Sequence, residues 1–183
     1  EIDYGDLDEG DDDDVTFKFK VSPDMEDGNY KLAVKIYEDG AEDTECVDKF
    51  DNQAFTELKI ERESDEGKFI AFNEIVVSPS EAVCGDRVTL TADVFNIGNE
   101  DQDQVKINLI SSELKLNTFF EIRSDLDQGD KETVTFEFAV PQGLAEKTYQ
   151  MSLSAEYDYK SGNYRESSDD DTKVPLKVFG CGV

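Results

Sequence analysis

The chain contains no histidine and no tryptophan, and only four prolines and three cysteines among its 183 residues. Without histidine, Ser-His-Asp and Cys-His catalytic arrangements cannot form, and imidazole metal sites are excluded. The sequence also lacks a phosphate-binding loop, a dinucleotide-binding fingerprint and a Gly-x-Ser-x-Gly motif. Paired carboxylates could hydrolyse glycosides, but chance pairs are unavoidable among 45 acidic residues. We therefore expect that the protein is not an enzyme.

Basic residues are scarce, because 18 Lys and Arg stand against 45 Asp and Glu and give a net charge of -27. Such a surface repels phosphate backbones, so we expect no nucleic-acid partner. No stretch approaches the ~20 apolar residues of a membrane span, so none is expected in this chain. High net charge is also typical of disorder, but 12 Phe, 7 Tyr and many alternating aliphatic residues can fill a core. We expect a folded protein with an acidic coat.

The sequence repeats itself at an offset of 119 residues. Residues 6–11 (DLDEGD) return as residues 125–130 (DLDQGD), and residues 15–21 (VTFKFKV) return as residues 134–140 (VTFEFAV). Ten of the sixteen positions from 6 to 21 are identical in the two repeats. A period this long indicates duplicated domains rather than short solenoid units. The first repeat lacks a counterpart of residues 75–120, so we expect either a fragment of a longer protein or a partner that supplies the missing strands.

Apolar and polar residues alternate with a period of two along the second repeat. The even positions of residues 88–94 and the odd positions of residues 105–109 are apolar, which is typical of strands with one buried face. The predicted strands span residues 74–77, 88–95, 105–109, 116–122, 133–140, 147–157 and 172–179. Seven short strands separated by turn residues are typical of an immunoglobulin-like sandwich. In its core we expect one group of side chains to face another, namely Val88, Leu90, Ala92 and Val94 to face Phe136, Phe138, Tyr149, Met151 and Leu153.

Three strands are predicted in the first repeat, at residues 15–21, 30–37 and 54–60, and they are equivalent to strands E, F and G of such a sandwich. Three strands cannot close a two-sheet core, so their apolar faces need a cover. The sequence therefore predicts an all-β chain of tandem immunoglobulin-like β-sandwiches, the first incomplete. Residues 1–62 form the C-terminal half of one sandwich, residues 63–73 an acidic linker, and residues 74–183 a complete seven-stranded sandwich.

The opening of the second repeat, residues 81–98 (EAVCGDRVTLTADVFNIG), resembles that of a CARDB domain, the cell-adhesion-related sandwich of bacterial and archaeal surface proteins. The shared pattern is a glycine before the strand and V-x-N-x-G at its end. Further matches are Leu126, Gly129, Val134, Thr135 and Phe136. Residues 167–171 (SSDDD) depart from the usual Asn-rich stretch. The resemblance implies an archaeal S-layer-type cell-surface protein.

Calcium is the one candidate cofactor that the sequence suggests. In the expected topology three loops of the second repeat share one end of the sandwich, and the linker arrives beside them. Ca²⁺ takes six to eight oxygens, often from flexible loops. The candidate ligands are Glu63, Asp65, Glu66, Glu100, Asp101, Asp103, Asp127, Asp169, Asp170 and Asp171. The alternative is a solvated acidic rim without a bound ion.

Three cysteines in an extracellular setting predict one disulfide and leave one cysteine over. The turn after the first strand and the end of the last strand lie at the same end of the expected sandwich, so we expect Cys84 to pair with Cys181. Cys46 lies in the acidic loop of the first repeat. Its partner lies in the absent half of that repeat, or it is a free thiol.

Two function classes fit these observations. The first is a structural cell-surface protein that forms part of an S-layer, stalk or extracellular filament, stabilised by calcium and completed by strands from a neighbouring subunit. Its partners are other copies of the chain or neighbouring envelope subunits, and its location is extracellular. The alternative is an adhesin or ligand-binding module of a larger secreted protein. No cluster of aromatic residues in the loops indicates a carbohydrate site.

Overall fold

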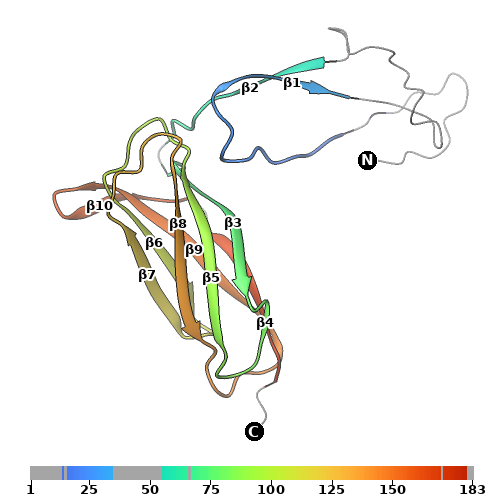
Figure 1. Ribbon diagram of the computed structural model, residues 1–183, viewed down its shortest axis with the longest axis vertical. Helices are drawn as coiled ribbons and strands as arrows, with labels where there is room; N and C mark the ends of the chain where they lie inside the picture. Colours follow the sequence, from blue (N-terminus) through green and yellow to red (C-terminus); the bar gives the residue numbers. More distant parts are fainter. Residues whose placement is uncertain (1–13, 15, 35–54, 66, 170, 181–183) are drawn as a thin grey trace, which may run out of the picture.

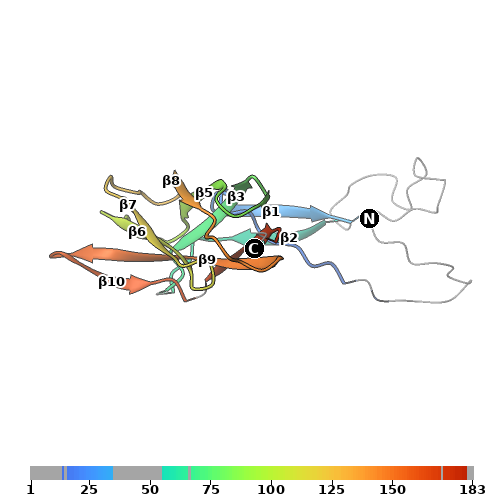
Figure 2. The ribbon, with the colours of Figure 1, turned by 90° about the horizontal axis from the view of Figure 1, so that it is seen from below.

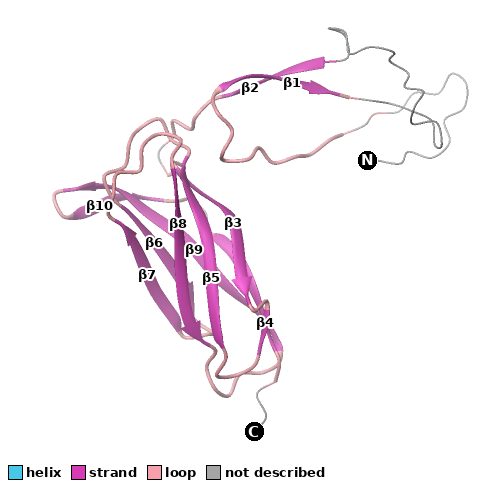
Figure 3. Ribbon diagram, in the orientation of Figure 1, coloured by secondary structure: helices cyan, strands magenta, loops and turns pink. Residues whose placement is uncertain are grey.

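The computed structural model describes residues 14, 16–34, 55–65, 67–169 and 171–180, and within them the chain is all-β (Figures 1 and 3). Two strands belong to the first repeat, β1 (Gly28–Ala33) and β2 (Phe55–Ile60). The strands of the second repeat are β3 (Ile70–Ser78), β4 (Glu81–Ala82), β5 (Arg87–Asn96), β6 (Val105–Ser111), β7 (Leu116–Ile122), β8 (Lys131–Ala139), β9 (Lys147–Lys160), β10 (Asn163–Ser167) and β11 (Thr172–Val178). No helix in the described part of the chain is long and apolar enough to cross a membrane.

The second repeat is a sandwich of two sheets. One sheet has the order β3-β5-β8, and the other has the order β4-β11-β9-β6-β7, with β10 paired to the far end of β9. Figure 2, which looks along the sandwich, shows β3, β5 and β8 in one layer and β6, β7 and β9 in the other. This is the predicted fold class, and it follows from strands whose apolar positions recur every second residue.

The core lies between these two sheets, as the alternation predicts. All nine side chains expected there lie in one cluster, with Val88, Leu90, Ala92, Val94, Met151 and Leu153 fully buried and Phe138 packed against the edge of the cluster. Leu90 lies opposite Phe136 within the three-stranded sheet, whereas Met151 and Leu153 come from the facing sheet. The members of the predicted core are therefore confirmed, but Phe136 and Phe138 lie beside the β5 side chains in the same sheet and do not face them.

One carboxylate is buried on the outer face of the three-stranded sheet. The Asp93 side chain, on β5, is only 8% exposed and accepts hydrogen bonds from Lys131 Nζ and Thr133 Oγ1, each at 2.6 Å. The Lys131 ammonium group, and then the Thr133 hydroxyl, hold the pKa of Asp93 below its ordinary value. This site is a satisfied cross-strand pair of the kind that stabilises a sheet.

Most strand bounds differ from the prediction by a few residues, and two strands were not predicted at all. β3 begins at Ile70 rather than residue 74, because an irregularity after Asn73, with φ of 46° at Glu74, interrupts the period of two on which the prediction depended. β4 has only two residues and was not predicted. β10 was also missed, although Ser161 and Gly162 have φ of 54° and 88°, which is the geometry of a two-residue hairpin turn.

β1 and β2 of the first repeat pair with nearly the same register as β9 and β11 of the second. Tyr30 lies opposite Leu58, and Tyr149 lies opposite Leu176. Equivalent positions are therefore 119 residues apart between β1 and β9, and 118 residues apart between β2 and β11. Each tyrosine hydroxyl also donates to the carbonyl four residues upstream, at 2.8 Å for Tyr30 and 2.9 Å for Tyr149. A tyrosine that bonds back to its own approach loop is a feature of immunoglobulin-like sandwiches.

The predicted strand at residues 15–21 is wrong for the residues that the structure describes there, since residues 16–21 have no strand pairing. Their counterpart, β8, pairs with β5, and the first repeat has no described segment equivalent to β5. An alternating sequence becomes a strand only when a neighbour accepts its hydrogen bonds. Phe17 and Phe19 are accordingly 51% and 57% exposed.

Candidate functional site at the junction of the two repeats

The linker between the repeats is bonded to the second sandwich. After β2, the Glu63 amide donates to the Ile97 carbonyl at 2.9 Å, and Glu63 forms an isolated parallel bridge with Gly98. A Cβ on Gly98 would lie 2.6 Å from the Phe69 ring, so the close approach of Phe69 requires glycine at position 98. Glycine in the V-x-N-x-G motif therefore allows the linker to pack on the loop after β5.

The loops predicted to converge do meet at this end of the sandwich. Gln102, between β5 and β6, and Leu126, between β7 and β8, exchange backbone hydrogen bonds of 3.1 and 2.9 Å. The buried Asn96 side chain donates to the carbonyls of Glu100 and Leu126 and accepts from the Gly98 amide. Asn96 thus joins two loops, which accounts for the asparagine of the same motif.

The acidic side chains predicted to bind calcium are mostly engaged within the chain or exposed. Glu63 Oε1 accepts from the amides of Ser64 and Asp65, and Asp65 pairs with Lys68 at 3.3 Å. Asp101 Oδ1 accepts from the Gln128 amide, and Asp171 pairs with Lys173 at 3.2 Å.

The other candidate ligands do not complete a cluster. Glu100, Asp103, Asp127 and Asp169 are exposed, and Glu66 and Asp170 lie outside the described residues. The Asp169 amide donates to the Gly67 carbonyl at 3.0 Å, so that loop does reach the linker. Within the described part of the chain, no three acidic or cysteine side chains are close enough together to hold a metal ion.

A polar hollow at the same end contains acids that the sequence did not single out. It is lined by Ser64, Phe69, Asn99, Glu100, Gln102, Asp158, Lys160 and Glu166. Lys160 pairs with Asp158 at 2.6 Å, and the Asp158 amide donates to Gln102 Oε1 at 2.9 Å. Asp158 and Glu166 were missed because residues 158–171 were predicted as one loop from which only residues 169–171 were chosen, whereas Asp158 lies in β9 and Glu166 in β10. The Ser161-Gly162 turn was the available signal, since it returns β10 to the side of β9.

Tyr157 lies beneath this end of the sandwich. Its side chain is fully buried, its ring lies 5.9 Å from that of Phe69, and its hydroxyl has no hydrogen-bond partner among the described residues. Burial raises the pKa of Tyr157, and the nearby backbone of Phe69 and Gly67 acts in the opposite direction. The phenol therefore stays protonated at neutral pH, and Tyr157 belongs to the core rather than to an exposed aromatic cluster.

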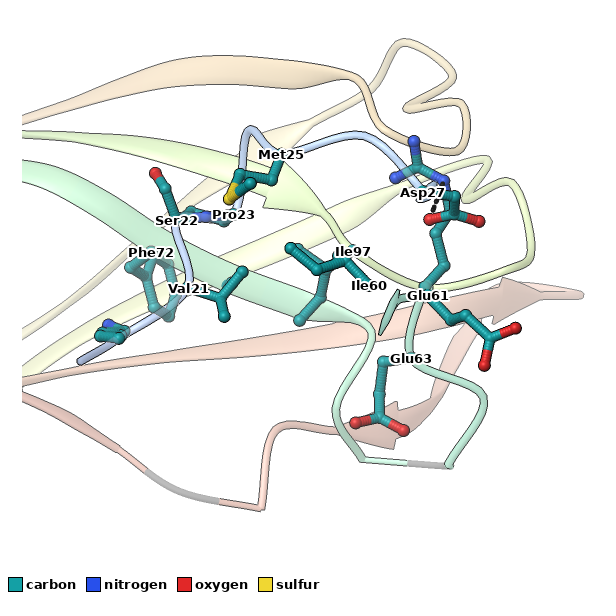
Figure 4. A pocket seen from close by; sticks show the side chains of 13 residues that line it. Val21, Ser22, Pro23, Met25, Asp27, Ile60, Glu61, Glu63, Phe72 and Ile97 are labelled. Carbon is teal, nitrogen blue, oxygen red and sulfur yellow. Dashed lines mark ion pairs between the residues drawn. The ribbon is translucent and has the colours of Figure 1, made fainter. Parts of the chain in front are cut away.

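An apolar pocket of about 240 Å³ lies between the two repeats (Figure 4). Val21, Pro23, Met25 and Ile60 line it from the first repeat, and Ala71, Phe72 and Ile97 line it from the second. Figure 4 shows the Val21 side chain directed toward those of Ile60 and Ile97. The junction therefore brings apolar side chains of both repeats together beside its acidic groups, with Phe72 buried and Val21 40% exposed.

Arg62 is a basic residue at this junction that the sequence did not single out. Its Nε lies 3.9 Å from Asp27 Oδ1 of the first repeat, and its side chain is 20% exposed. A Cβ on Gly129 would lie 2.3 Å from Arg62 Nη2, and Gly129 has φ of 83°, so the guanidinium group covers the turn before β8. Arg62 contacts both repeats and offsets part of the negative charge between them.

The opposite end of the sandwich contains Cys84. There β4 and β11 run parallel, Val178 lies opposite Ala82, and the Phe179 amide donates to the Ala82 carbonyl at 2.9 Å. The chain segments that lead to Cys84 and toward Cys181 are thus adjacent. Cys181 and Cys46 lie outside the described residues, so the disulfide between Cys84 and Cys181 stays a prediction.

Comparison with solved structures gives remote likenesses. The CARDB domain of a Pyrococcus furiosus protein, in complex with di-metal ions, is 13% identical over 63% of this chain and 94% of that one, with a TM-score of 0.41. A Niemann-Pick type C2 protein from Japanese carpenter ant is 12% identical over 65% and 99%, with a TM-score of 0.39. An alkylpurine DNA glycosylase of Pseudomonas fluorescens, bound to DNA, is 11% identical over 61% of this chain and 31% of that one, with a TM-score of 0.38.

The family of the chain is shown by its sequence. No curated protein matches the sequence. A family model does match it, over residues 69–168, and that model describes CARDB. The matched segment is more than half of the chain and runs from the linker to the loop after β10. The chain belongs to the CARDB family.

Proposed function

We propose that this chain is a structural part of a cell-surface protein, in an S-layer, a stalk or an extracellular filament. Its family suggests an extracellular module related to cell adhesion. The observation that carries the proposal is the tandem repetition, in which β1 and β2 reproduce the register and the tyrosine contact of β9 and β11. Repeated sandwiches of one design are suited to extended assemblies rather than to catalysis, and the chain acts without enzymatic activity.

The junction supports a structural role, because it restrains how the repeats are joined. The Glu63 amide in the linker donates to the Ile97 carbonyl, and Met25 and Ile97 line the same pocket. Arg62 lies between Asp27 and Gly129. A flexible tether between independent domains would need none of these contacts. The junction therefore transmits the orientation of one repeat to the next.

Neighbouring subunits are the partners in this proposal. The first repeat exposes apolar side chains that its counterpart buries, with Leu32 at 38% exposed where Met151, at the equivalent position, is fully buried. Phe17 and Phe19 are exposed as well. Strands from a neighbouring envelope subunit would cover this face and complete the sandwich.

Calcium is a separate part of the proposal. The loop end carries exposed carboxylates on Glu100, Asp103, Asp127 and Asp169, and a divalent ion would reduce their mutual repulsion. The described acids do not form a ready cluster, so binding requires them to move. We expect millimolar calcium to raise the melting temperature above that measured with chelator at matched ionic strength. An unchanged melting temperature means that the acids form only a solvated coat.

Surface localisation in the source cell tests the main proposal. Antibodies against residues 69–168 should label intact cells, and the protein should be an abundant component of the isolated envelope. Detection only inside the cell would refute the proposal. Deletion of the gene should alter envelope order or cell shape. If deletion leaves these unchanged but abolishes attachment to a surface or to other cells, the protein is an adhesin within a larger secreted protein.

A further inference from the structure

β7 is the exposed edge strand of the larger sheet. It pairs with β6 on one side and has no strand on the other side among the described residues. Figure 1 shows β7 at the margin of the sandwich, away from β3 and from the first repeat. The outer row of its amides and carbonyls can therefore accept another strand, and proteins normally protect such an edge.

The side chains of β7 do not give the usual protection. Phe119 and Phe120 are 57% and 38% exposed, and the seven residues of the strand contain one charged residue, Glu121. Phe119 lies on the outer face, opposite Asn108 of β6, whereas Phe120 lies on the core side, opposite Ile107. Exposed aromatic residues along an unpaired edge mark an interaction surface.

Charge at this edge is balanced, although the whole chain carries -27. Glu113 and Lys115 lie in the turn before the strand, where Lys115 has φ of 52°, Glu121 lies in the strand, and Arg123 follows it. Lys115 is exposed and forms no ion pair with the described residues, while Glu121 pairs with Arg123 at 2.6 Å. Two chains with this net charge repel each other over most of their surfaces, so a balanced edge is where they can approach.

We propose that β7 pairs antiparallel with β7 of a second molecule of the same chain, about a two-fold axis at Thr118. In that register the residue numbers of opposite positions sum to 236. Within the ladder Leu116 then lies opposite Phe120, and Asn117 lies opposite Phe119. Lys115, in the turn just before the strand, comes next to Glu121 of the second molecule at the end of the ladder. Two-fold symmetry produces each of these pairs twice. Opposite charges and apolar pairs directly across a ladder both stabilise it.

The charges select this register over its neighbours. Moving the two-fold axis one residue toward the C-terminus places Lys115 opposite Arg123, and moving it one residue toward the N-terminus places Glu113 opposite Glu121. Both shifts bring like charges together at the ends of the ladder, because residues 113, 115 and 123 flank the strand, and this destabilises the pairing. An axis placed between two residues would make each outer-face position of one strand lie opposite a core-side position of the other, so the faces of the two strands would not match. The complementarity therefore defines one pairing.

This inference rests on the proposed function, because it specifies how neighbouring subunits contact each other, but its test does not depend on where the protein is located. The full chain is examined by sedimentation equilibrium at physiological ionic strength, and we expect a reversible dimer. Lys115→Glu creates two like-charge contacts, and we expect it to raise the dimer Kd by about tenfold or more. Glu121→Lys should do the same, and the double variant should restore the affinity.

Matched controls separate local pairing from total charge. Lys173→Glu changes the net charge as Lys115→Glu does, and Glu137→Lys changes it as Glu121→Lys does. Both positions are exposed and lie on β11 and β8 rather than on β7. Each control should alter the dimer Kd less than the β7 variant that carries the same charge change. The thermal melting of every variant is measured to show that each one is folded.

A cross-link tests the position of the axis. Only residue 118 lies opposite itself, and directly opposed residues in an antiparallel ladder have Cα atoms about 4.5 to 5.5 Å apart, which is within reach of a disulfide. Thr118→Cys should give a dimer joined between the two introduced cysteines under mild oxidation, identified by peptide mapping. Arg123→Cys is the control, because position 123 lies opposite position 113 and should not join to itself.

The outcomes are decisive in each arm. A dimer that the single charge reversals weaken, that the double variant restores and that residue 118 cross-links supports the pairing. A chain that stays monomeric at hundreds of micromolar overturns it. A dimer whose Kd responds equally to the control variants, or that does not cross-link at residue 118, uses another surface and also overturns it.

Discussion

Met151 and Leu32 occupy equivalent positions in the two repeats, yet their surroundings differ, and this difference can be measured. Met151, on β9, is fully buried in the second sandwich, whereas Leu32, on β1, is 38% exposed. Replacing a buried Leu, Ile or Met by Ala typically costs about 2 to 5 kcal/mol, because apolar contacts are lost and a cavity remains. Met151→Ala should therefore destabilise the second sandwich strongly.

The expected shift follows from the size of the domain. A loss of 1 kcal/mol lowers the melting temperature of a domain slightly above 100 residues by roughly 4 °C, so Met151→Ala, at about 2 to 5 kcal/mol, should lower it by about 8 to 20 °C. Leu32→Ala should change the same transition by no more than about 2 °C, since exposed substitutions usually stay within about 0.5 kcal/mol.

Differential scanning calorimetry and urea titration followed by circular dichroism provide the measurements. If Met151→Ala lowers the melting temperature by only a degree or two, the assignment of Met151 to the core is wrong. If Leu32→Ala is as damaging as Met151→Ala, the face of the first repeat is already covered in solution. That result would contradict the exposed face described above and would favour a neighbour that supplies strands.

Two further predictions concern the cysteines and pH. Non-reducing peptide mapping should find Cys84 joined to Cys181, a bridge worth up to about 4 to 5 kcal/mol in the chain-entropy model, and a linkage of Cys46 to either residue would contradict the topology. Because the pKa of Asp93 is lower in the folded state, its pairing with Lys131 adds stability above the unfolded-state pKa of about 3.9, and this stability is lost as pH falls through the folded-state pKa. Asp93→Asn should therefore lower the melting temperature at neutral pH. The gap between the melting temperatures of variant and wild type should become smaller in acid, and a gap that stays constant across that pH range would count against the pairing.

Much of the second sandwich could be predicted because each strand has one buried face. The bounds of β7 match the prediction of residues 116–122, and the core side chains of β5 and β9 follow the period of two. The prediction was wrong where periodicity does not determine pairing. Residues 16–21 alternate as strongly as β8 but lack a described partner strand, and β10 depends on the turn at Ser161 and Gly162 rather than on its own pattern.

The junction was predictable in outline but not in detail. Topology placed the linker beside the loops between strands, and the contacts of Glu63 with Ile97 and of Gln102 with Leu126 lie there. Net charge gave no indication that Arg62 would lie over Gly129 or that Lys68 would pair with Asp65. Those contacts depend on the path of individual side chains, which composition does not specify.

The direction in which the chain passes through the second sandwich has a mechanical consequence. It enters along β3 at the end near the linker and leaves along β11 at the opposite end (Figure 1). Tension applied through the chain therefore pulls along these two strands, and the hydrogen bonds that join β3 to β5 and β11 to β9 lie across the pulling direction. Such bonds are sheared together rather than opened one after another. A filament built from these repeats would resist stretching until whole ladders slide, and would then give way abruptly.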